Sequence, residues 1–312
     1  METKAGDPGA FAHFDLNRIP SPAFVVDEVA VRRNLEILAD IKARSGARVL
    51  LALKAFSMWS LAPLIDEYLD GYCASGLWEA RLAKECYNGP ISTYSPAYKA
   101  ADLAELAEIS EHITFNNPQQ IEHWKSDSTQ DITIDISEIG LRINPEIALG
   151  ETEKYDPSQP HSRLGFPISQ LAPDHFQHLS GIHFHNLCEQ GFDALQQTWE
   201  KVEPVIAPHF DSLKWINLGG GHHITCHMPD VIEAPYRPAM LGERPEGTAI
   251  RLGGPSCLAG DIIGDYILPD EPYIGQRIAF LDQAHYSMVK TNTFNGVPLP
   301  SIWLWNSESD TL

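Results

Sequence analysis

Short apolar runs alternate with amphipathic segments along the first two thirds of the chain. The runs are rich in Val, Ile and Leu and are too short for helices, so we interpret them as buried strands. The segments between them carry apolar residues at helical spacing. Seven strands in such a repeat predict a parallel sheet covered by helices. The strands are expected at RVLLALK, GYCAS, ISTYS, HITF, IGLRIN, GIHFH and LKWINL, and the helices include LWEARLAKECY, AADLAELAEI and DALQQTWEKVEPVI.

Two α/β architectures fit this repeat, namely an open doubly wound sheet and a closed eight-stranded barrel. A sheet that binds a dinucleotide would carry a G-x-G-x-x-G string after its first strand, and the chain has no such string there. We therefore expect a (β/α)8-type barrel that has one strand fewer than the eight needed to close it.

The two ends of the chain have a different texture. PAFVVD (22–27) is typical of a strand, and Asp27 is a suitable N-cap for the helix that follows. After Thr225 the sequence is dense in Pro and Gly with short β-like runs, which favours an antiparallel β domain. We predict a barrel domain over 28–225 and a β domain formed by 1–27 and 226–312.

Composition and charge narrow the class of ligand. The chain has 312 residues, of which 43% are hydrophobic, enough for one large domain or two ordinary ones. It carries 22 Lys and Arg against 42 Asp and Glu, a formal net charge of -20. Such a charge repels nucleic acid and favours cationic partners, a polyamine among them.

The cysteines and the N-terminus indicate the compartment. The five cysteines are odd in number, scattered, and never spaced as a C-x-x-C pair, which fits a reducing cytoplasm. The N-terminal METKAGDPGAFAHFDLN has no apolar core, and no later stretch approaches eighteen uncharged apolar residues. We expect neither an export signal nor a membrane span.

Lys54 ends the apolar run LLALK. A buried charge is costly unless it is paired, neutralised or used chemically. In a βα barrel the working residues lie where strands end. A lysine in apolar surroundings has a lowered pKa, and its neutral amine can form a Schiff base with an aldehyde such as pyridoxal 5'-phosphate. The alternative is a lysine whose amine merely reaches solvent at the rim of the barrel.

Two later strand ends carry further candidates. Gly219, Gly220 and Gly221 follow directly after the strand LKWINL, where bare backbone N–H groups can hold a phosphate. An ordinary tight turn is the alternative. Arg142 is a charge within the strand IGLRIN and needs a partner, either an acidic neighbour or an anionic ligand.

His183 and His185 in GIHFHN lie on one face of a strand, because side chains alternate between faces. Barrel hydrolases present two zinc ligands at this spacing, so a zinc site is an alternative, with His222, His223 or His227 as a third ligand. A hydrogen-bonded core histidine is the other alternative.

At the level of longer strings, the chain resembles the carboxynorspermidine/carboxyspermidine decarboxylases. This family belongs to the alanine-racemase-fold decarboxylases that use pyridoxal 5'-phosphate (PLP), together with ornithine and diaminopimelate decarboxylases. The resemblance extends over nearly the whole chain. It is carried by LALKAFS, CASGLWEARLAKE, TYSPAYK, SRLGF, GIHFHNLCE, INLGGGHHIT, CHMPDVIEAPYRP, RLGGPSCLAGDIIGDY and AHYSMVKTNTFNGVPLP.

The resemblance implies a PLP site without a metal. Lys54 would be the lysine that holds the cofactor covalently, and His185 would stack on the pyridine ring. Gly219 to Gly221 would hold the phosphate, with a further contact from Tyr286. The expected reaction is the decarboxylation of a carboxylated triamine to norspermidine or spermidine.

The resemblance also implies a homodimer with shared sites. Cys257 would reach across the dimer interface and act as a proton donor, and Lys54 could serve as the donor instead. Asp230 and Asp261 would bind the cationic substrate, for which a carboxylate is a suitable counter-charge.

The chain departs from the family at the junction Thr225–Cys226. There the family has a further segment of several tens of residues, which contains the eighth barrel strand and an EPGEA-like motif. The glutamate of this motif pairs with the pyridine nitrogen of the cofactor. The chain has no E-P-G string. The alternative hypothesis is therefore a truncated or degenerate homologue that binds PLP or polyamine without turnover.

Overall fold

A computed structural model describes residues 7–126, 136–150, 153, 156–188, 190–222, 238–284 and 286–312. The chain divides into two compact units. We call them the sheet unit (Lys42–Lys54 and Met58–Ile224) and the hairpin unit (Met1–Ile41, Ala55–Ser57 and Thr225–Leu312). The predicted domain boundary near Thr225 lies outside the described residues, and the boundary at residue 28 stays a prediction.

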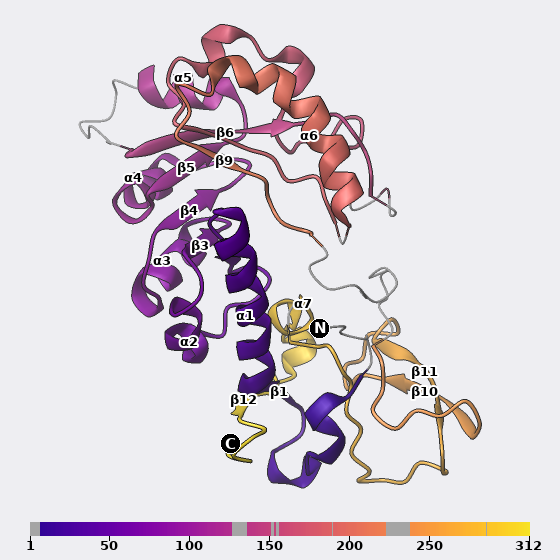
Figure 1. The fold of residues 1–312 in the computed structure, drawn as a ribbon. Coiled ribbons are helices and arrows are strands. Elements are labelled where there is room, and N and C mark those ends of the chain that lie inside the picture. The colour runs from indigo at the N-terminus through magenta and orange to yellow at the C-terminus, as the bar shows by residue number, and fades with distance from the viewer. Residues whose placement is uncertain are drawn as a thin grey trace. The chain divides into compact units, whose positions relative to one another are not determined.

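The sheet unit is built on a curled parallel sheet (Figure 1). All neighbouring strands pair in parallel, and the short strand β7 (Phe166–Pro167) pairs with β6 beside the main path. Within the described residues, no strand pairs with the outer side of β2 or of β9, so the sheet is open. The seven predicted barrel strands are confirmed, in the order β2 (Leu50–Ala52), β3 (Gly71–Ala74), β4 (Ile91–Tyr94), β5 (His112–Phe115), β6 (Glu138–Asn144), β8 (Gly181–His183) and β9 (Trp215–Asn217).

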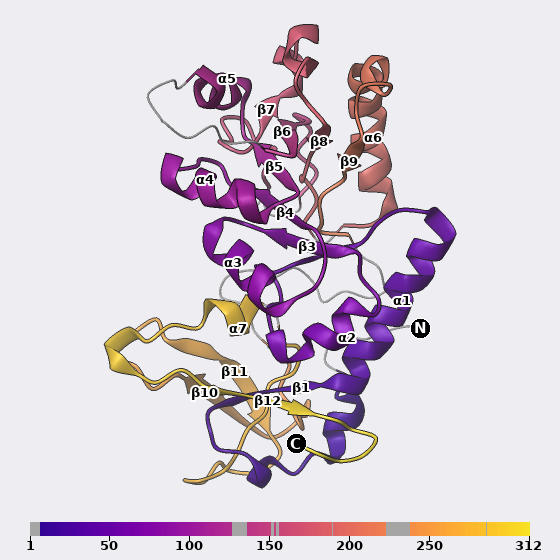
Figure 2. The same cartoon turned by 90° about the vertical axis from the view of Figure 1, so that its left-hand side faces the viewer.

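Helices connect successive strands of the sheet unit and flank the sheet (Figure 2). They are amphipathic, and their apolar stripes supply buried residues such as Leu106 and Val202. The α-helices are α2 (Ala62–Asp66), α3 (Leu77–Cys86), α4 (Ala100–Ile109), α5 (Pro118–Ser126) and α6 (Phe192–Ile206), and the 3₁₀ turns are η3 (Trp59–Leu61), η5 (Ile168–Gln170), η6 (Pro173–Phe176) and η7 (Ala207–His209).

The two faces of the sheet differ in chemistry. Because successive strand residues point to opposite faces, Leu141 and Ile143 fall on one face of β6 and Arg142 on the other. Arg142 is in register with His183 on β8, which is in register with Asn217 on β9. One face of the sheet therefore contributes aliphatic core, and the other gathers polar side chains.

The hairpin unit contains two pairs of strands. β10 (Thr248–Gly253) and β11 (Ile262–Leu268) form an antiparallel hairpin, and β1 (Ala23–Asp27) pairs in parallel with β12 (Ser301–Trp305). PAFVVD thus belongs to this unit, as expected. The predicted antiparallel β structure is present as the hairpin of β10 and β11. The parallel pair of β1 and β12 was not predicted. The helices that begin in this unit are α1 (Glu28–Ser45) and α7 (Tyr286–Lys290), and the 3₁₀ turns are η1 (Gly9–His13), η2 (Leu16–Arg18) and η8 (Phe294–Gly296).

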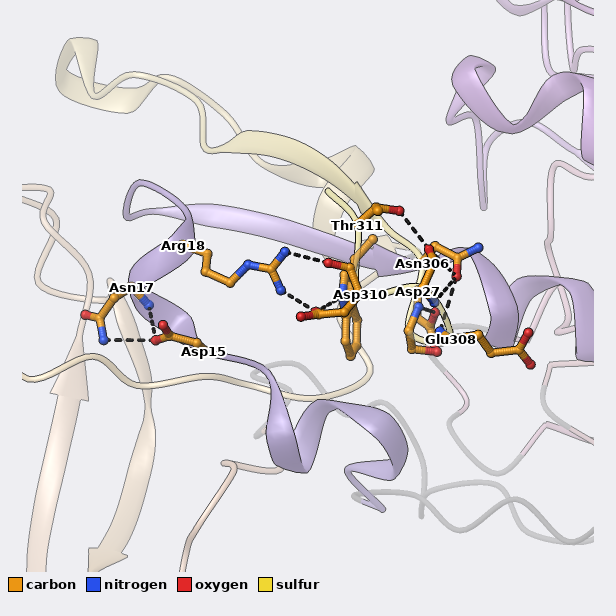
Figure 3. A network of polar contacts seen from close by, with 11 residues as sticks. Asp15, Asn17, Arg18, Asp27, Asn306, Glu308, Asp310 and Thr311 are labelled. Atoms are coloured by element: carbon orange, nitrogen blue, oxygen red, sulfur yellow. Dashed lines mark hydrogen bonds and ion pairs between the residues drawn. The ribbon is translucent and has the colours of Figure 1, made fainter.

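A polar network connects residues 15–27 with residues 306–311 in the hairpin unit (Figure 3). Asp27 is buried and accepts hydrogen bonds from the backbone N–H of Val29 at 3.1 Å and from the hydroxyl of Ser307 at 2.9 Å. Arg18 forms an ion pair with Asp310. Asp27 thereby caps α1, as predicted, and also orders the residues after β12.

The described helices include none long and apolar enough to cross a lipid bilayer.

Candidate active site

Lys54 lies at the C-terminal edge of the sheet, two residues after β2. The pairing with β3 continues through Leu53, whose backbone N–H donates to the Cys73 carbonyl at 3.1 Å and whose side chain is buried. Although part of the Lys54 side chain reaches solvent, desolvation lowers the pKa of its amine, and the positive charge of Arg142 lowers it further. Glu79 and Cys73 oppose this shift. A lowered pKa increases the fraction of the amine that is neutral and nucleophilic at a given pH.

His185 lies two residues after β8, and its imidazole is held in a neutral form. The backbone N–H of Gly220 donates to Nδ1 at 3.0 Å, so the ring proton belongs on Nε2. Burial lowers the pKa of His185 to about 3, and the positive charges of Lys54 and Arg142 act in the same direction. A neutral imidazole offers a flat face to an aromatic ligand.

The glycine run after β9 packs tightly against the segment after β8. Gly219 has φ +73°, and a Cβ there would lie 2.5 Å from the Phe184 carbonyl oxygen. Gly221 has φ +83°, and its Cβ would lie 2.2 Å from the Leu187 carbonyl oxygen. These two positions require glycine, because the backbone of the turn packs directly against the backbone of residues 184–187.

Arg142 is a buried guanidinium, with a residue exposure of 4%. Its Nη2 donates to the backbone oxygen of His185 at 2.9 Å, and its Cζ lies 4.6 Å from the ring centre of Tyr94. Its Nε is buried and has no acceptor among the described residues, which also offer it no carboxylate within ion-pair distance. Of the two partners that the sequence left open, the structure supports an anionic ligand.

His183 contacts neighbours on its own sheet. Its Nδ1 lies 3.3 Å from the backbone oxygen of Asn217, and burial keeps its pKa well below the usual range. Among the residues that the structure describes, no three His, Cys, Asp or Glu side chains are grouped as a metal site would require. His223 and His227, the other ligands considered for zinc, lie outside the described residues.

The remaining predicted residues belong to the hairpin unit. Cys257 is exposed, and its backbone N–H donates to Asn295 Oδ1 at 3.0 Å. The carboxylate of Asp261 accepts the Ser256 backbone N–H at 3.0 Å, and hydrogen bonds from Ser256 lower its pKa. Tyr286 is the first residue of α7 and is 38% exposed. Asp230 lies outside the described residues.

The structure thus brings together Lys54, His185 and the run Gly219 to Gly221 within the sheet unit. A meeting of Cys257, Asp261 and Tyr286 with this group stays a prediction from the resemblance. The sequence analysis missed Tyr94 and Glu79, which contact or influence the group. Their positions at a strand end and in the first turn of α3 were the available signal.

Comparison with known proteins identifies close relatives, although no model of a protein family matches the chain. A carboxynorspermidine/carboxyspermidine decarboxylase of Campylobacter jejuni subsp. jejuni is 32% identical over 94% of this chain and 95% of its own length. A carboxyaminopropylagmatine decarboxylase of Synechocystis sp. is 34% identical, covering 92% of this chain and 90% of that protein.

Solved structures agree with the sequence relatives. The crystal structure of carboxynorspermidine decarboxylase complexed with norspermidine from Campylobacter jejuni superimposes with a TM-score of 0.80 at 32% identity, covering 94% of this chain and 96% of that one. A diaminopimelate decarboxylase has a TM-score of 0.72 at 16% identity, over 92% and 90% of the two chains, and supports the fold alone. The predicted fold class is confirmed.

The alignment with the Campylobacter jejuni decarboxylase is longer than the part of this chain that it covers. It spans 368 positions, whereas 94% of this 312-residue chain is about 293 residues. About 75 aligned positions therefore have no counterpart in this chain. This difference agrees with a segment that the relative has and this chain lacks.

Proposed function

The chain belongs to the family of carboxynorspermidine/carboxyspermidine decarboxylases, and from this premise we propose that it decarboxylates a carboxylated triamine with PLP bound at Lys54. The observation that carries the proposal is the position of the Lys54 amine, at the edge of the sheet beside the neutral His185 and the glycine run. Decarboxylation in polyamine biosynthesis is the activity of this family.

The residues of the sheet unit fit PLP. The packing of Gly219 and Gly221 against the backbone of residues 184–187 fixes the shape of the turn in which we propose that the phosphate lies. The buried Nε of Arg142 is a donor available to an anionic oxygen. When bound, the cofactor supplies an electron sink for the electrons released as CO2 leaves.

The chain's own residues would bind and orient the reactants. Lys54 offers its amine, and desolvation lowers the pKa of that amine, which increases the fraction available as a nucleophile. His185 offers a flat neutral ring held by the Gly220 N–H, which prevents the imidazole from rotating. The run Gly219 to Gly221 would lie against the phosphate. Because the Gly219 and Gly220 N–H groups already donate to Asn217 Oδ1 and to His185 Nδ1, the contacts to it would come from the Gly221 N–H and from Tyr286.

We propose that protonation of the product carbon involves the Cys257 thiol or the Lys54 ammonium. Cys257 is exposed in the hairpin unit, which suits a residue that serves the neighbouring subunit of a homodimer. Asp261 and Asp230 would counter the positive charges of the substrate. The scattered cysteines support a location in the reducing cytoplasm.

The net charge of -20 supports a polycationic substrate. Carboxynorspermidine and carboxyspermidine differ by one methylene, a small difference for a binding site to discriminate. The relative from Synechocystis sp., named for carboxyaminopropylagmatine, favours a guanidino substrate as a second candidate.

A chain that binds PLP without turnover is the alternative function. It is favoured by the absence of an E-P-G string and by the roughly 75 alignment positions that this chain lacks. A weak counter-charge at the pyridine nitrogen would weaken the electron sink.

The test combines cofactor uptake with turnover. We expect the purified chain with added PLP to show the absorbance of lysine-bound cofactor, lost in Lys54→Ala and retained in the matched variant Lys84→Ala, whose lysine lies on α3. We further expect CO2 release from carboxynorspermidine, carboxyspermidine or carboxyaminopropylagmatine. Cofactor uptake without CO2 from any of the three would establish the alternative, and no uptake would contradict both.

A further inference from the structure

Tyr94 ends β4, and its ring contacts side chains that project from two other strands. The Arg142 guanidinium lies 4.6 Å from the ring centre, and the His183 ring lies 5.6 Å from it. A cation against an aromatic face is attracted to it, more strongly where water is excluded. Arg142 is such a desolvated cation.

The Tyr94 ring is itself held in place from outside the sheet. Its hydroxyl donates to Asn116 Oδ1 at 2.7 Å. The same oxygen accepts the Gly165 backbone N–H at 2.7 Å, and Asn116 Nδ2 donates to the Arg163 backbone oxygen at 2.9 Å. The ring is therefore tied to Asn116 and, through it, to the loop of Arg163 and Gly165.

Arg142 has few other restraints. Within the described residues its side chain donates from Nη2 to the backbone oxygen of His185 and interacts with the Tyr94 side chain, and its Nε has no acceptor. No described carboxylate lies within ion-pair distance of the guanidinium, so its orientation rests on Tyr94 and on the His185 backbone oxygen.

We propose that Tyr94 is a positioning residue of the active site, whose ring holds the Arg142 guanidinium against the His185 backbone and near the Lys54 amine. The proposal deepens the proposed function, because Lys54 is the amine that would bind the cofactor. It assigns to Tyr94 an effect on Lys54 that passes through Arg142.

The consequence can be measured on the chain without cofactor. Desolvation is the largest influence that lowers the pKa of Lys54. Among the charged groups, Arg142 on β6 lowers it further, and Glu79 on α3 and Cys73 on β3 raise it. If Tyr94→Leu frees the guanidinium, the pKa of Lys54 rises and a smaller fraction of the amine is neutral at a given pH.

The experiment is competitive acetylation of the full chain with acetic anhydride across pH 6 to 10, followed by mass spectrometry of the Lys54 peptide. We expect Lys54 in Tyr94→Leu to react about fivefold more slowly at neutral pH, a change comparable to loss of one cation–π contact. Tyr94→Phe keeps the ring and loses the hydroxyl that bonds Asn116, so it should change the rate less than Tyr94→Leu does.

Two controls separate positioning from simple loss of stability. Tyr87→Leu removes another buried tyrosine, whose ring centre lies 4.6 Å from that of Tyr72. It should lower the unfolding temperature without moving the Lys54 profile. In an Arg142→Met background, Tyr94→Leu should produce no further shift, because the residue through which it acts is gone.

An equal shift in Tyr87→Leu, an unchanged profile in Tyr94→Leu, or an undiminished effect in the Arg142→Met background would each overturn the proposal. PLP uptake by the original chain is measured in parallel. A chain that takes up no PLP but shows the expected acetylation pattern would contradict the proposed function and support the role of Tyr94.

Discussion

Gly219, Gly220 and Gly221 share one turn but differ in their surroundings. Gly219 and Gly221 have positive φ and would place a Cβ within 2.5 Å of a backbone oxygen, whereas a Cβ on Gly220 would meet only His185 Cε1 at 3.9 Å. The turn therefore depends on its outer two residues for its shape.

We predict that Gly219→Ala and Gly221→Ala each lower the free energy of unfolding by about 1–3 kcal/mol, because strained backbone and a steric clash act together. Both should also weaken PLP uptake. Gly220→Ala, the matched control, should change the free energy of unfolding by less than about 0.5 kcal/mol. Denaturant unfolding and absorbance titration measure these effects, and equal losses in all three variants would contradict the interpretation of the turn.

At individual residues, the sequence predicted those whose chemistry conflicts with their local surroundings. Lys54 stood out because it ends an apolar run, and the glycine run because three such residues follow a strand. Tyr94 could not be found in this way, since a tyrosine is ordinary in a strand. Its importance comes from contact with Arg142, which lies 48 positions away in the chain and two strands across the sheet.

Among the elements, β9 is held to its neighbours by Trp215. The residues Thr114, Gly140, Gly181 and Trp215 occupy one row across four strands, each in register with the next. The Trp215 ring lies over the two glycines, where an added Cβ would lie 2.1 Å from it at Gly181 and 2.4 Å at Gly140. The ring thus fills the space that two side chains would occupy.

Gly181→Ala should lower the free energy of unfolding by about 1–3 kcal/mol through overpacking against Trp215. In a Trp215→Ala background the same substitution should cost less than about 0.5 kcal/mol, so the two changes are coupled. Gly191→Ala, at a site with no neighbour within 4 Å, is the control. Additive losses measured by denaturant unfolding would show that the ring does not exclude a side chain there.

The strands of the sheet could be predicted because each is a short apolar run set off by helical spacing. The partner of β1 could not, because it pairs with β12 nearly 280 residues later, and a sequence pattern does not carry such a pairing. The two-residue strand β7 was also missed, because it is too short to show any alternation.

At the scale of the whole molecule, the sheet unit holds several imidazoles that favour the neutral form. Burial lowers the pKa of His183, His185, His112 and His222, strongly for the first two. In the unfolded chain these groups would titrate near their ordinary pKa of about 6.5. At a pH between the folded-state and the unfolded-state pKa of an imidazole, the unfolded protein binds more protons than the folded protein. The free energy of unfolding therefore falls as the pH falls below about 6.5.

We therefore predict that lowering the pH from 7 to 5.5 reduces the free energy of unfolding by about 1 kcal/mol for each imidazole that stays neutral in the folded state. The window lies above the range in which Asp carboxylates titrate, so histidines dominate the change. Denaturant unfolding at the two pH values provides the measurement. The double variant His183→Gln, His185→Gln should lose about 2 kcal/mol of this pH dependence, whatever its stability at pH 7, because glutamine binds no proton in either state. A pH dependence that the double substitution does not diminish would mean that these two imidazoles are already charged in the folded protein, which would remove the neutral ring that His185 is proposed to offer the cofactor.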